Sequence, residues 1–303
     1  MKTISIIIPT LNGEEELKAL LPLIPKREDI EVIIIDSQSD DFTKEVAISY
    51  GAQVLEINRQ DFNHGGTRNV AAQKAKGDIL VFLTQDALLC DGSSIDQLVQ
   101  AFENNDVGIA YGRQLPHRNA KIFGSFARDF NYSTVSLEKN LENKEKYGIK
   151  TVFLSNSFAA YRREVLEEVG GFPVNIILGE DMYVAAKAVL AGYSIAYVAD
   201  AKVYHSHDYS IREEFQRNFD IGVLHKKENW ILAEFSNAEG EGFKFVKSEW
   251  QYLLKKGMPH LIIVSIVRNA AKLFGYKLGK NYEKLPKSTR KTLSMYKSYW
   301  NYN

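Results

Sequence analysis

The chain has 303 residues, of which 45% are hydrophobic, and this is enough to bury a full core. Its one cysteine, Cys90, excludes an internal disulfide framework and indicates a reducing compartment. The formal net charge is zero, and no stretch approaches the roughly 20 apolar residues that a membrane-spanning helix requires. The apolar run before Pro9 is short, so we expect a buried strand there rather than an export signal, and a cytoplasmic protein.

The first two-thirds of the chain alternates short apolar runs with segments of helical composition. Strands are expected at residues 4–9, 32–35, 54–57, 79–83, 152–161, 195–198 and 202–205, and helices at 14–21, 43–50, 67–76, 162–169 and 181–190. Apolar strands separated by helices predict βαβ units, and therefore an α/β fold with a Rossmann-like, mostly parallel sheet covered on both faces. Residues 117–149 interrupt this pattern and are expected to form an insertion over the sheet, whereas the chain beyond residue 211 is expected to be helical.

Polar residues gather where the expected strands end. Thr10 and Asn12 follow the first strand, Asp36 ends the second, and Gln85 and Asp86 follow the fourth. Ligands of open parallel sheets bind beyond the carboxyl ends of the strands. A binding site is therefore expected along this edge of the sheet.

The segment DSQSDDFT begins at Asp36, directly after a buried strand. A helix cap accounts for Asp40 or Asp41, because aspartate is favoured at caps, and Asp41 is expected to serve chiefly in that way. That interpretation leaves Asp36 without a role. A carboxylate at the strand tip can accept the imide N–H of a uracil or thymine ring, so Asp36 is interpreted as a nucleotide contact.

The segment FNHGGTRN follows the third expected strand and precedes an expected helix. Gly65 and Gly66 allow the backbone to approach a ligand closely and to direct free N–H groups towards an anion. Arg68 can reach a phosphate oxygen. A glycine pair before a helix can also be a simple tight turn, but the neighbouring His64, Arg68 and Asn69 suit a phosphate or a sugar.

A metal site is expected where LTQDA places Asp86 beside this loop. Mg²⁺ is usually held by one or two carboxylates and substrate phosphates, so one aspartate is sufficient to bridge the protein and a pyrophosphate. An aspartate that only caps a loop is the alternative. In YHSHDYS, His205 and His207 lie two residues apart, on one face if the segment is extended. Either histidine can complete the shell of a Mg²⁺ or Mn²⁺ ion.

The segment GED places Glu180 and Asp181 at the start of a helix. Acidic residues in a first turn ordinarily interact with the helix dipole, which is the simplest explanation of this pair. Paired carboxylates near a nucleotide site also offer a general base that can deprotonate an acceptor hydroxyl. Both interpretations are open at this point.

Taken together, these motifs resemble the inverting nucleotide-sugar glycosyltransferase family 2 with the GT-A fold. The matching segments, in chain order, are SIIIPTLN, DSQSDDFT, TRN, TQDA, SNSFAAYRREVLEEVGGF, GED and HSHDYS, and they span residues 4 to about 210. Each segment is weak alone, whereas the ordered set is specific. NHGGTRN together with TQDA is similar to the rhamnosyltransferase branch, whose donor is dTDP-L-rhamnose. The resemblance therefore implies a rhamnosyltransferase that acts on a growing cell-wall or surface polysaccharide.

The resemblance also implies a role for each matching residue. Thr10 and Asp36 would contact the nucleoside, Arg68 the donor, Asp86 with His205 or His207 the metal, and Glu180 the sugar hydroxyls, with Asp181 as catalytic base. The sequence departs from the family's DxD motif at Thr84-Gln85-Asp86, where the first aspartate is absent. This departure leaves the metal dependent on a single aspartate.

Residues 244–303 form a basic tail with 13 Lys or Arg and two acids, a net charge of +11 that the rest of the chain balances with −11. Its aromatic and aliphatic residues make the composition typical of an amphipathic helix at an anionic lipid surface. We therefore expect a GT-A nucleotide-sugar transferase domain at residues 1–211, and a helical region at 212–303 that contacts the inner face of the plasma membrane, near a lipid-linked glycan acceptor. An ordinary helical subdomain or a homodimer contact is the alternative. No nucleic-acid-binding motif is recognised in the tail, so nucleic acid is not an expected partner.

Two other functions stay open at this stage. One is the same fold with a UDP-hexose or UDP-N-acetylhexosamine donor. The other is a nucleotide-sugar-binding scaffold without turnover. The intact GED and TQDA segments argue against the scaffold, because a protein that only binds has no need of a base.

Overall fold

The computed structural model of the protein describes residues 2–235 and 239–301. The chain packs as two compact units. Unit 1 comprises Met1–Asn119, Asn131–Val174 and Glu180–Ser206, and unit 2 comprises Ala120–Phe130, Asn175–Gly179 and His207–Asn303. The expected functional boundary at residue 211 stays a prediction.

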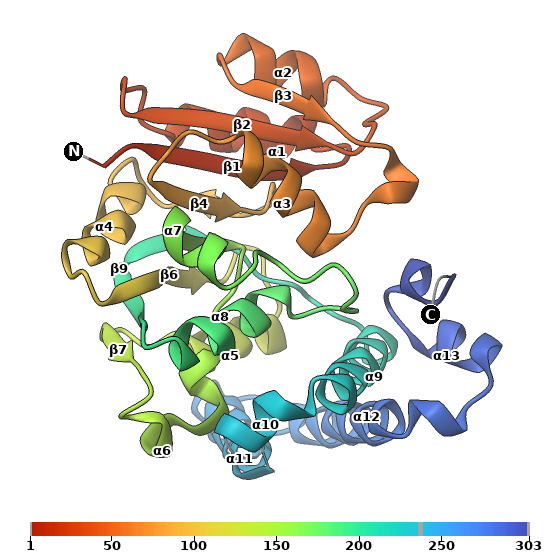
Figure 1. The fold of residues 1–303 in the computed structure, drawn as a ribbon. Coiled ribbons are helices and arrows are strands. Elements are labelled where there is room, and N and C mark those ends of the chain that lie inside the picture. Colours follow the sequence, from red (N-terminus) through yellow and green to blue (C-terminus); the bar gives the residue numbers. More distant parts are fainter. Residues whose placement is uncertain (1, 236–238, 302–303) are drawn as a thin grey trace. The chain divides into compact units, whose positions relative to one another are not determined.

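A nine-stranded sheet forms the centre of unit 1 (Figure 1). The strands are β1 (Ile4–Thr10), β2 (Ile30–Asp36), β3 (Gln53–Glu56), β4 (Ile79–Leu83), β5 (Leu88–Leu89), β6 (Val107–Leu115), β7 (Leu137–Lys139), β8 (Phe158–Arg162) and β9 (Ser194–Tyr204). Their order is β3-β2-β1-β4-β8-β6-β9-β5, with β7 paired to β9 off this path. Neighbours among β1 to β4 are parallel, as are β6 and β9, whereas β8 is antiparallel to β4 and β6. The expected mostly parallel α/β sheet is confirmed.

Helices connect these strands and cover the sheet. In unit 1 they are α1 (Glu14–Leu20), α2 (Thr43–Ser49), α3 (His64–Lys74), α4 (Ser94–Gln100), α6 (Lys144–Tyr147), α7 (Arg163–Glu168) and α8 (Glu180–Leu190). Ile6 of β1, Leu17 of α1 and Leu98 of α4 belong to one buried hydrophobic cluster. Every residue of β4 is buried, as expected of a strand that is covered on both faces.

Several expected element boundaries were wrong. The strand expected at residues 152–161 is shorter, because β8 begins at Phe158. Helix α3 begins at His64 instead of residue 67, because Asn63 caps it from outside: its Oδ1 accepts the Gly66 N–H at 2.8 Å. The two strands expected at residues 195–198 and 202–205 are one strand, β9. Its register against β6 shifts between Val198 and Lys202, so the strand continues through the interruption. The insertion expected over the sheet is also divided, since β7 extends the sheet beside β9 and residues 120–130 belong to unit 2.

Asp41 stabilises the start of two helices. Its Oδ1 accepts the N–H of Thr43, the first residue of α2, at 3.1 Å. Its Oδ2 accepts the N–H of Glu14, the first residue of α1, also at 3.1 Å. Asp41 therefore stabilises the start of the helix it was expected to cap, although the N-cap residue itself is Phe42.

Unit 2 consists of helices, as expected for the chain beyond residue 211. They are α5 (Ile122–Asn131), α9 (Ile211–Lys227), α10 (Asn229–Phe235), α11 (Glu239–Lys255), α12 (Leu261–Lys280) and α13 (Lys287–Leu293). The backbones of α9 and α12 touch, because a Cβ at Gly279 would lie 1.9 Å from the Phe219 carbonyl oxygen. Within the described part of the chain, no helix combines the length and the hydropathy needed to cross a bilayer.

Candidate active site

Side chains at the carboxyl edge of the sheet tie the loops after β1, β2 and β4 together. Thr10 and Asp36 are paired in register at the ends of β1 and β2, and Thr10 Oγ1 donates to Asp36 Oδ1 at 3.1 Å. Gln85, after β4, accepts the Leu11 N–H through Oε1 at 2.9 Å and donates to the Leu11 carbonyl at 3.3 Å. These residues, expected at this edge, are therefore brought together.

The loop after β2 is held by Asp36 and Asn12. Asp36 is completely buried, and its carboxylate accepts the N–H of Ser39 at 2.8 Å and the Ser39 hydroxyl at 2.5 Å. Asn12 has a left-handed φ of +50°; it donates its N–H to Ser39 Oγ and accepts the N–H of Asp40, both at 2.8 Å. Asp36 thus has a structural role, and the inference that it lacked one was wrong. A carboxylate offers about four acceptor sites, so a nucleoside contact stays a prediction.

The glycine pair lies inside the first turn of α3, not before it. The N–H of Gly66 is taken by the Asn63 cap, so the expectation that it is free for an anion was wrong. At Gly65, a Cβ would lie 2.1 Å from the Pro173 carbonyl oxygen, and packing alone therefore requires a glycine. Donor contacts by His64 and Gly65 stay predictions.

Arg68 forms a buried ion pair with Glu180. Nη1 of Arg68 lies 3.1 Å from Glu180 Oε1, and the two side chains are only 5% and 9% exposed. The same nitrogen donates to the His64 carbonyl at 2.8 Å. Burial acts to raise the pKa of Glu180, but the positive charges of Arg68 and His64 outweigh it and hold the pKa below its ordinary value. Glu180 is therefore an ionised acid with a fixed partner.

Asp181, the next residue, is in a different state. It is partly exposed; Oδ1 accepts the N–H of Met182 at 2.8 Å and Oδ2 that of Asn156 at 3.3 Å. Burial and the negative charge of Glu180 raise the pKa of Asp181 to about 6. Adjacent carboxylates whose environments separate their pKa values are suited to different roles, one as a proton acceptor and one as a fixed charge.

Asn156 connects the two acids to the core. Its side-chain nitrogen donates to Glu180 Oε1 at 3.3 Å, and its side-chain oxygen accepts the Tyr161 hydroxyl at 2.6 Å. Tyr161 is completely buried and packs edge-on against Phe82 and Phe172. Neither Asn156 nor Tyr161 was predicted from the sequence to be a site residue. The available signal was a polar SNS segment directly before an apolar strand.

Asp86 and His205 face each other at the same edge of the sheet. Nε2 of His205 lies 3.5 Å from Asp86 Oδ2. His207 follows two residues later, and ligand atoms of all three residues lie within 4.8 Å of one another. The sequence left open which histidine accompanies Asp86, and both lie within reach. Two imidazole nitrogens and one carboxylate oxygen fit Mn²⁺ better than Mg²⁺, which takes oxygen ligands.

Gln114 orients the ring of His205. Nδ1 of His205 lies 2.9 Å from Gln114 Oε1, and both side chains are buried. An amide oxygen only accepts hydrogen bonds, so a hydrogen on Nδ1 satisfies this contact, and Nε2 is the ring nitrogen that faces Asp86. Metal-binding histidines commonly have such a partner. The sequence around Gln114 gives no sign of this role.

The chain is similar to glycosyltransferases in sequence and in structure. Residues 5–170 match the sequence model of glycosyl transferase family 2. The O-antigen chain rhamnosyltransferase RfbN of Salmonella typhimurium is 50% identical, over 98% of this chain and 96% of RfbN. The O-antigen chain rhamnosyltransferase WbaN of Salmonella anatum is 47% identical, over 99% of this chain and 96% of WbaN.

Among solved structures, the mannosyltransferase PcManGT from Pyrobaculum calidifontis, in complex with GDP-Man and Mn²⁺, has a TM-score of 0.67. The match covers 94% of this chain and 88% of that protein at 16% identity. At this identity the likeness concerns the fold alone, and the expected GT-A fold is confirmed.

Proposed function

The chain belongs to glycosyl transferase family 2, and from this premise we propose that it transfers L-rhamnose from dTDP-L-rhamnose to a hydroxyl of a lipid-linked, O-antigen-type glycan. The observation that supports this most is the 50% identity to an O-antigen chain rhamnosyltransferase across nearly the whole of both chains. Because the match to an enzyme covers nearly the whole of both chains, a nucleotide-sugar-binding scaffold without turnover is the weaker candidate. A UDP-sugar donor is the remaining alternative.

Asp181 is the proposed base. The acceptor oxygen attacks the anomeric carbon, the bond from that carbon to the diphosphate oxygen breaks, and the acceptor proton passes to the Asp181 carboxylate. A pKa of about 6 leaves Asp181 ionised at pH 7 while making it a stronger base than an ordinary aspartate. The displacement occurs in one step and therefore inverts the anomeric configuration.

Glu180 and Arg68 are proposed to act at the donor and sugar. Their ion pair fixes the Glu180 carboxylate, which accepts hydrogen bonds from sugar hydroxyls, and keeps a positive charge beside it. Asp86, His205 and His207 would hold a divalent cation, which neutralises charge on the diphosphate when bound. Thr10, Asp36, Asn12 and Gln85 are proposed to border the nucleoside, with His64 and Gly65 nearer the diphosphate.

Donor identity is tested by thermal shift with Mn²⁺ and a panel of dTDP- and UDP-sugars. We expect dTDP-L-rhamnose to raise Tm most, and rhamnose transfer to a lipid-linked acceptor to release dTDP. A larger shift with a UDP-sugar would replace the donor assignment. Binding without transfer to any acceptor, under conditions where a Salmonella relative is active, would favour the scaffold.

The proposed acceptor also bears on where the enzyme works. A lipid-linked glycan lies in a membrane, and the basic tail, residues 244–303, supports a peripheral contact with the anionic inner face of the plasma membrane. The tail's alternative role, a homodimer contact, is tested by measuring the mass of the protein in solution.

A further inference from the structure

Helix α12 turns its small and polar residues inward. Its buried residues are Ser265, Gly275 and Gly279, and the Arg268 side chain is only 12% exposed. A helix on the surface of a water-soluble protein normally buries its apolar stripe and presents polar residues to water. In α12 this order is reversed.

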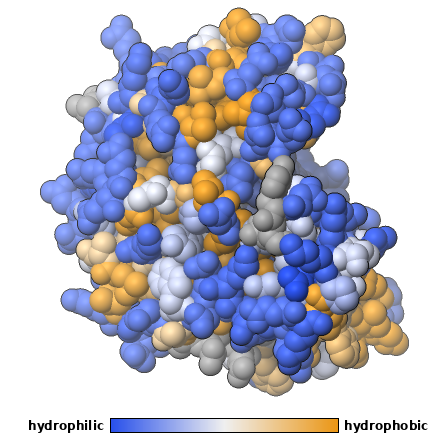
Figure 2. Space-filling model, turned by 45° about the vertical axis from the view of Figure 1, so that its right-hand side comes forward, coloured by the Kyte–Doolittle hydropathy of each residue, from blue (hydrophilic) through white to orange (hydrophobic). Residues whose placement is uncertain are grey.

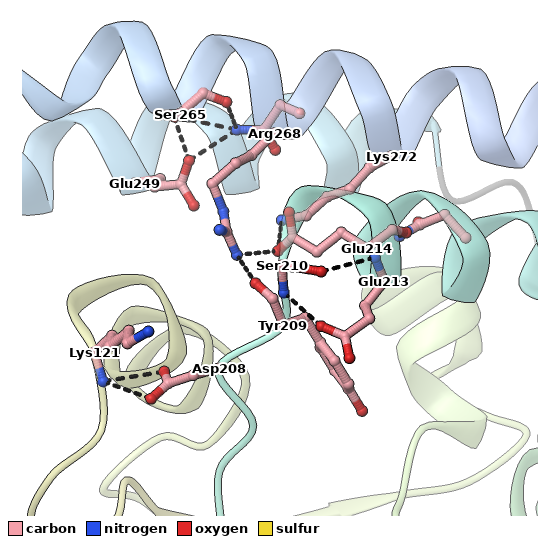
Figure 3. Close-up of polar contacts among 12 residues, drawn as sticks. Lys121, Asp208, Tyr209, Ser210, Glu213, Glu214, Glu249, Ser265, Arg268 and Lys272 are labelled. Carbon is pink, nitrogen blue, oxygen red and sulfur yellow. Dashed lines mark hydrogen bonds and ion pairs between the residues drawn. The ribbon is translucent and has the colours of Figure 1, made fainter. Parts of the chain in front are cut away.

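Buried acids hold the inward face in place (Figure 3). Arg268 Nη2 donates to Glu214 Oε1 on α9 at 2.7 Å and to the Tyr209 carbonyl at 2.9 Å. Lys272, one turn later, has its Nζ 3.4 Å from the same Glu214 oxygen. Glu214 is itself buried, so it requires these cations.

A second buried acid, Glu249 of α11, fixes the N-terminal half of α12. Its carboxylate accepts a hydrogen bond from the hydroxyl of Ser265 and another, at 2.8 Å, from the side-chain nitrogen of Asn269. Rotation of α12 about its axis would leave both Glu214 and Glu249 without these partners in the interior. The helix is therefore locked with one particular side facing outward.

The outward side of α12 is apolar. Its exposed large residues are Ile263, Val264, Ile266, Val267, Leu273, Phe274 and Leu278, with exposed fractions between 37% and 71%. Spacings of three, four and seven residues place them along one stripe. Figure 2 shows hydrophobic side chains gathered at the lower right of the molecule, at the height where Figure 1 places α12. Exposed apolar stripes of this kind mark interaction surfaces.

The surroundings of this stripe are positively charged. Helix α12 contains no acidic residue. Exposed lysines lie just before it, at Lys255 and Lys256, and at its end, at Lys277 and Lys280. An occupant of the stripe must therefore be apolar at its centre and anionic at its edge.

We propose that the outward stripe of α12 docks on an anionic lipid bilayer, with the helix axis parallel to the membrane plane. The apolar side chains enter the boundary between headgroups and acyl chains, and the lysines contact lipid phosphates. A second copy of the chain fits less well, because two copies would bring the same lysines together. The choice of a membrane rests on the proposed lipid-linked acceptor, whereas the stripe and its charge do not.

The test is cosedimentation of the full chain with phosphatidylcholine vesicles, with and without phosphatidylglycerol. The wild type is expected to bind the anionic vesicles more tightly. Ile266→Glu combined with Phe274→Glu should weaken this binding at least about tenfold. Each change places a charge where the proposed docking buries an apolar side chain in the bilayer. The matched control is Ile48→Glu with Val135→Glu, two exposed apolar positions in unit 1, which should leave binding unchanged.

A second variant separates charge from hydrophobicity. Lys277→Gln with Lys280→Gln should remove most of the preference for anionic vesicles, roughly fivefold per lysine, and leave binding to neutral vesicles unchanged. A circular-dichroism melt of each variant confirms that it is folded. Thermal shift with the donor is measured in parallel, so that a loss of membrane binding and an error in the proposed reaction are told apart.

Three results would overturn the proposal. The wild type could fail to bind anionic vesicles, the Ile266/Phe274 variant could bind as the wild type does, or the control could lose binding equally. A wild-type dimer that the Ile266/Phe274 variant dissociates, without any vesicle binding, would assign the stripe to a second copy instead.

Discussion

The guanidinium of Arg68 lies 3.1 Å from the carboxylate of Glu180, joining the second turn of α3 to the first turn of α8 in the interior of unit 1. Glu180 immediately precedes Asp181 in the chain. Burial and, after it, the charge on Glu180 raise the pKa of Asp181, and the charge on Arg68 helps to keep Glu180 ionised. The buried ion pair therefore contributes to the protonation of its neighbour.

Breaking this pair should cost stability. Arg68→Met leaves Glu180 charged and unpaired in the interior, which typically costs about 3–5 kcal/mol. The double variant, Arg68→Met with Glu180→Met, should regain most of that loss, because no unpaired charge remains. Chemical denaturation of the three proteins measures the difference. A single variant as stable as the wild type would contradict the buried pair.

Asp181→Asn should abolish most turnover and spare donor binding. Loss of a general base typically lowers the rate by about 10²–10⁴-fold. Turnover is measured at saturating acceptor, and donor affinity by calorimetry. Turnover near the wild-type level would remove Asp181 from the role of base.

The pH dependence follows from the raised pKa of Asp181. Since the proposed base, Asp181, must be ionised to accept a proton, kcat/KM should rise with pH through about 6 and then level off. Stability should change in the opposite sense. The folded protein holds the proton up to about pH 6, whereas the unfolded chain loses it near pH 4, so this group reduces stability as pH rises between those values. Asp181→Asn should therefore raise Tm at pH 7 and leave it unchanged at pH 4.

Gln114 should matter for metal affinity although it binds no metal itself. Gln114→Leu removes the acceptor of His205 Nδ1, and loss of such a partner typically weakens metal binding about 10–100-fold. His205→Ala and Asp86→Ala should weaken it further. Mn²⁺ binding is followed by electron paramagnetic resonance, without substrate. Equal affinity in Gln114→Leu and wild type would show that the ring needs no such support.

The close contact between α9 and α12 requires a glycine at position 279, and a second glycine outside this contact provides a control. Gly279→Ala would drive a Cβ against the Phe219 carbonyl oxygen, so Tm should fall by several degrees. Gly242→Ala, at an exposed position of α11 with open space around it, is the matched control. It should raise stability slightly, by roughly 0.5–1 kcal/mol, through helix propensity. Thermal melts that rank the two variants otherwise would contradict the close packing.

The sheet was predictable because parallel strands covered on both faces are continuous apolar runs, and β4 is such a run. The start of α3 was not, since the Asn63 cap lies before a glycine pair that resembles a turn. In β9, a polar interruption at Asp200 concealed one continuous strand.

Motif residues could be found from the sequence, but their partners could not. Asp181 and Asp86 stand out because they follow apolar segments. Gln114 meets His205 across 91 residues of chain, and such a contact leaves no local pattern. In the basic tail, composition predicted an amphipathic helix but not which face lies inward. That depends on Glu214, a buried acid far from α12 in sequence.

The hydrogen bonds that join Thr10 to Asp36 and Gln85 to Leu11 hold the loops after β1, β2 and β4 together. A ligand that arrives at these loops meets a shape that is already set. Little conformational entropy is then lost on binding, and selectivity among nucleotides depends on fit rather than on rearrangement. Replacing the nucleobase of the donor should therefore change the dissociation rate of the donor far more than its association rate.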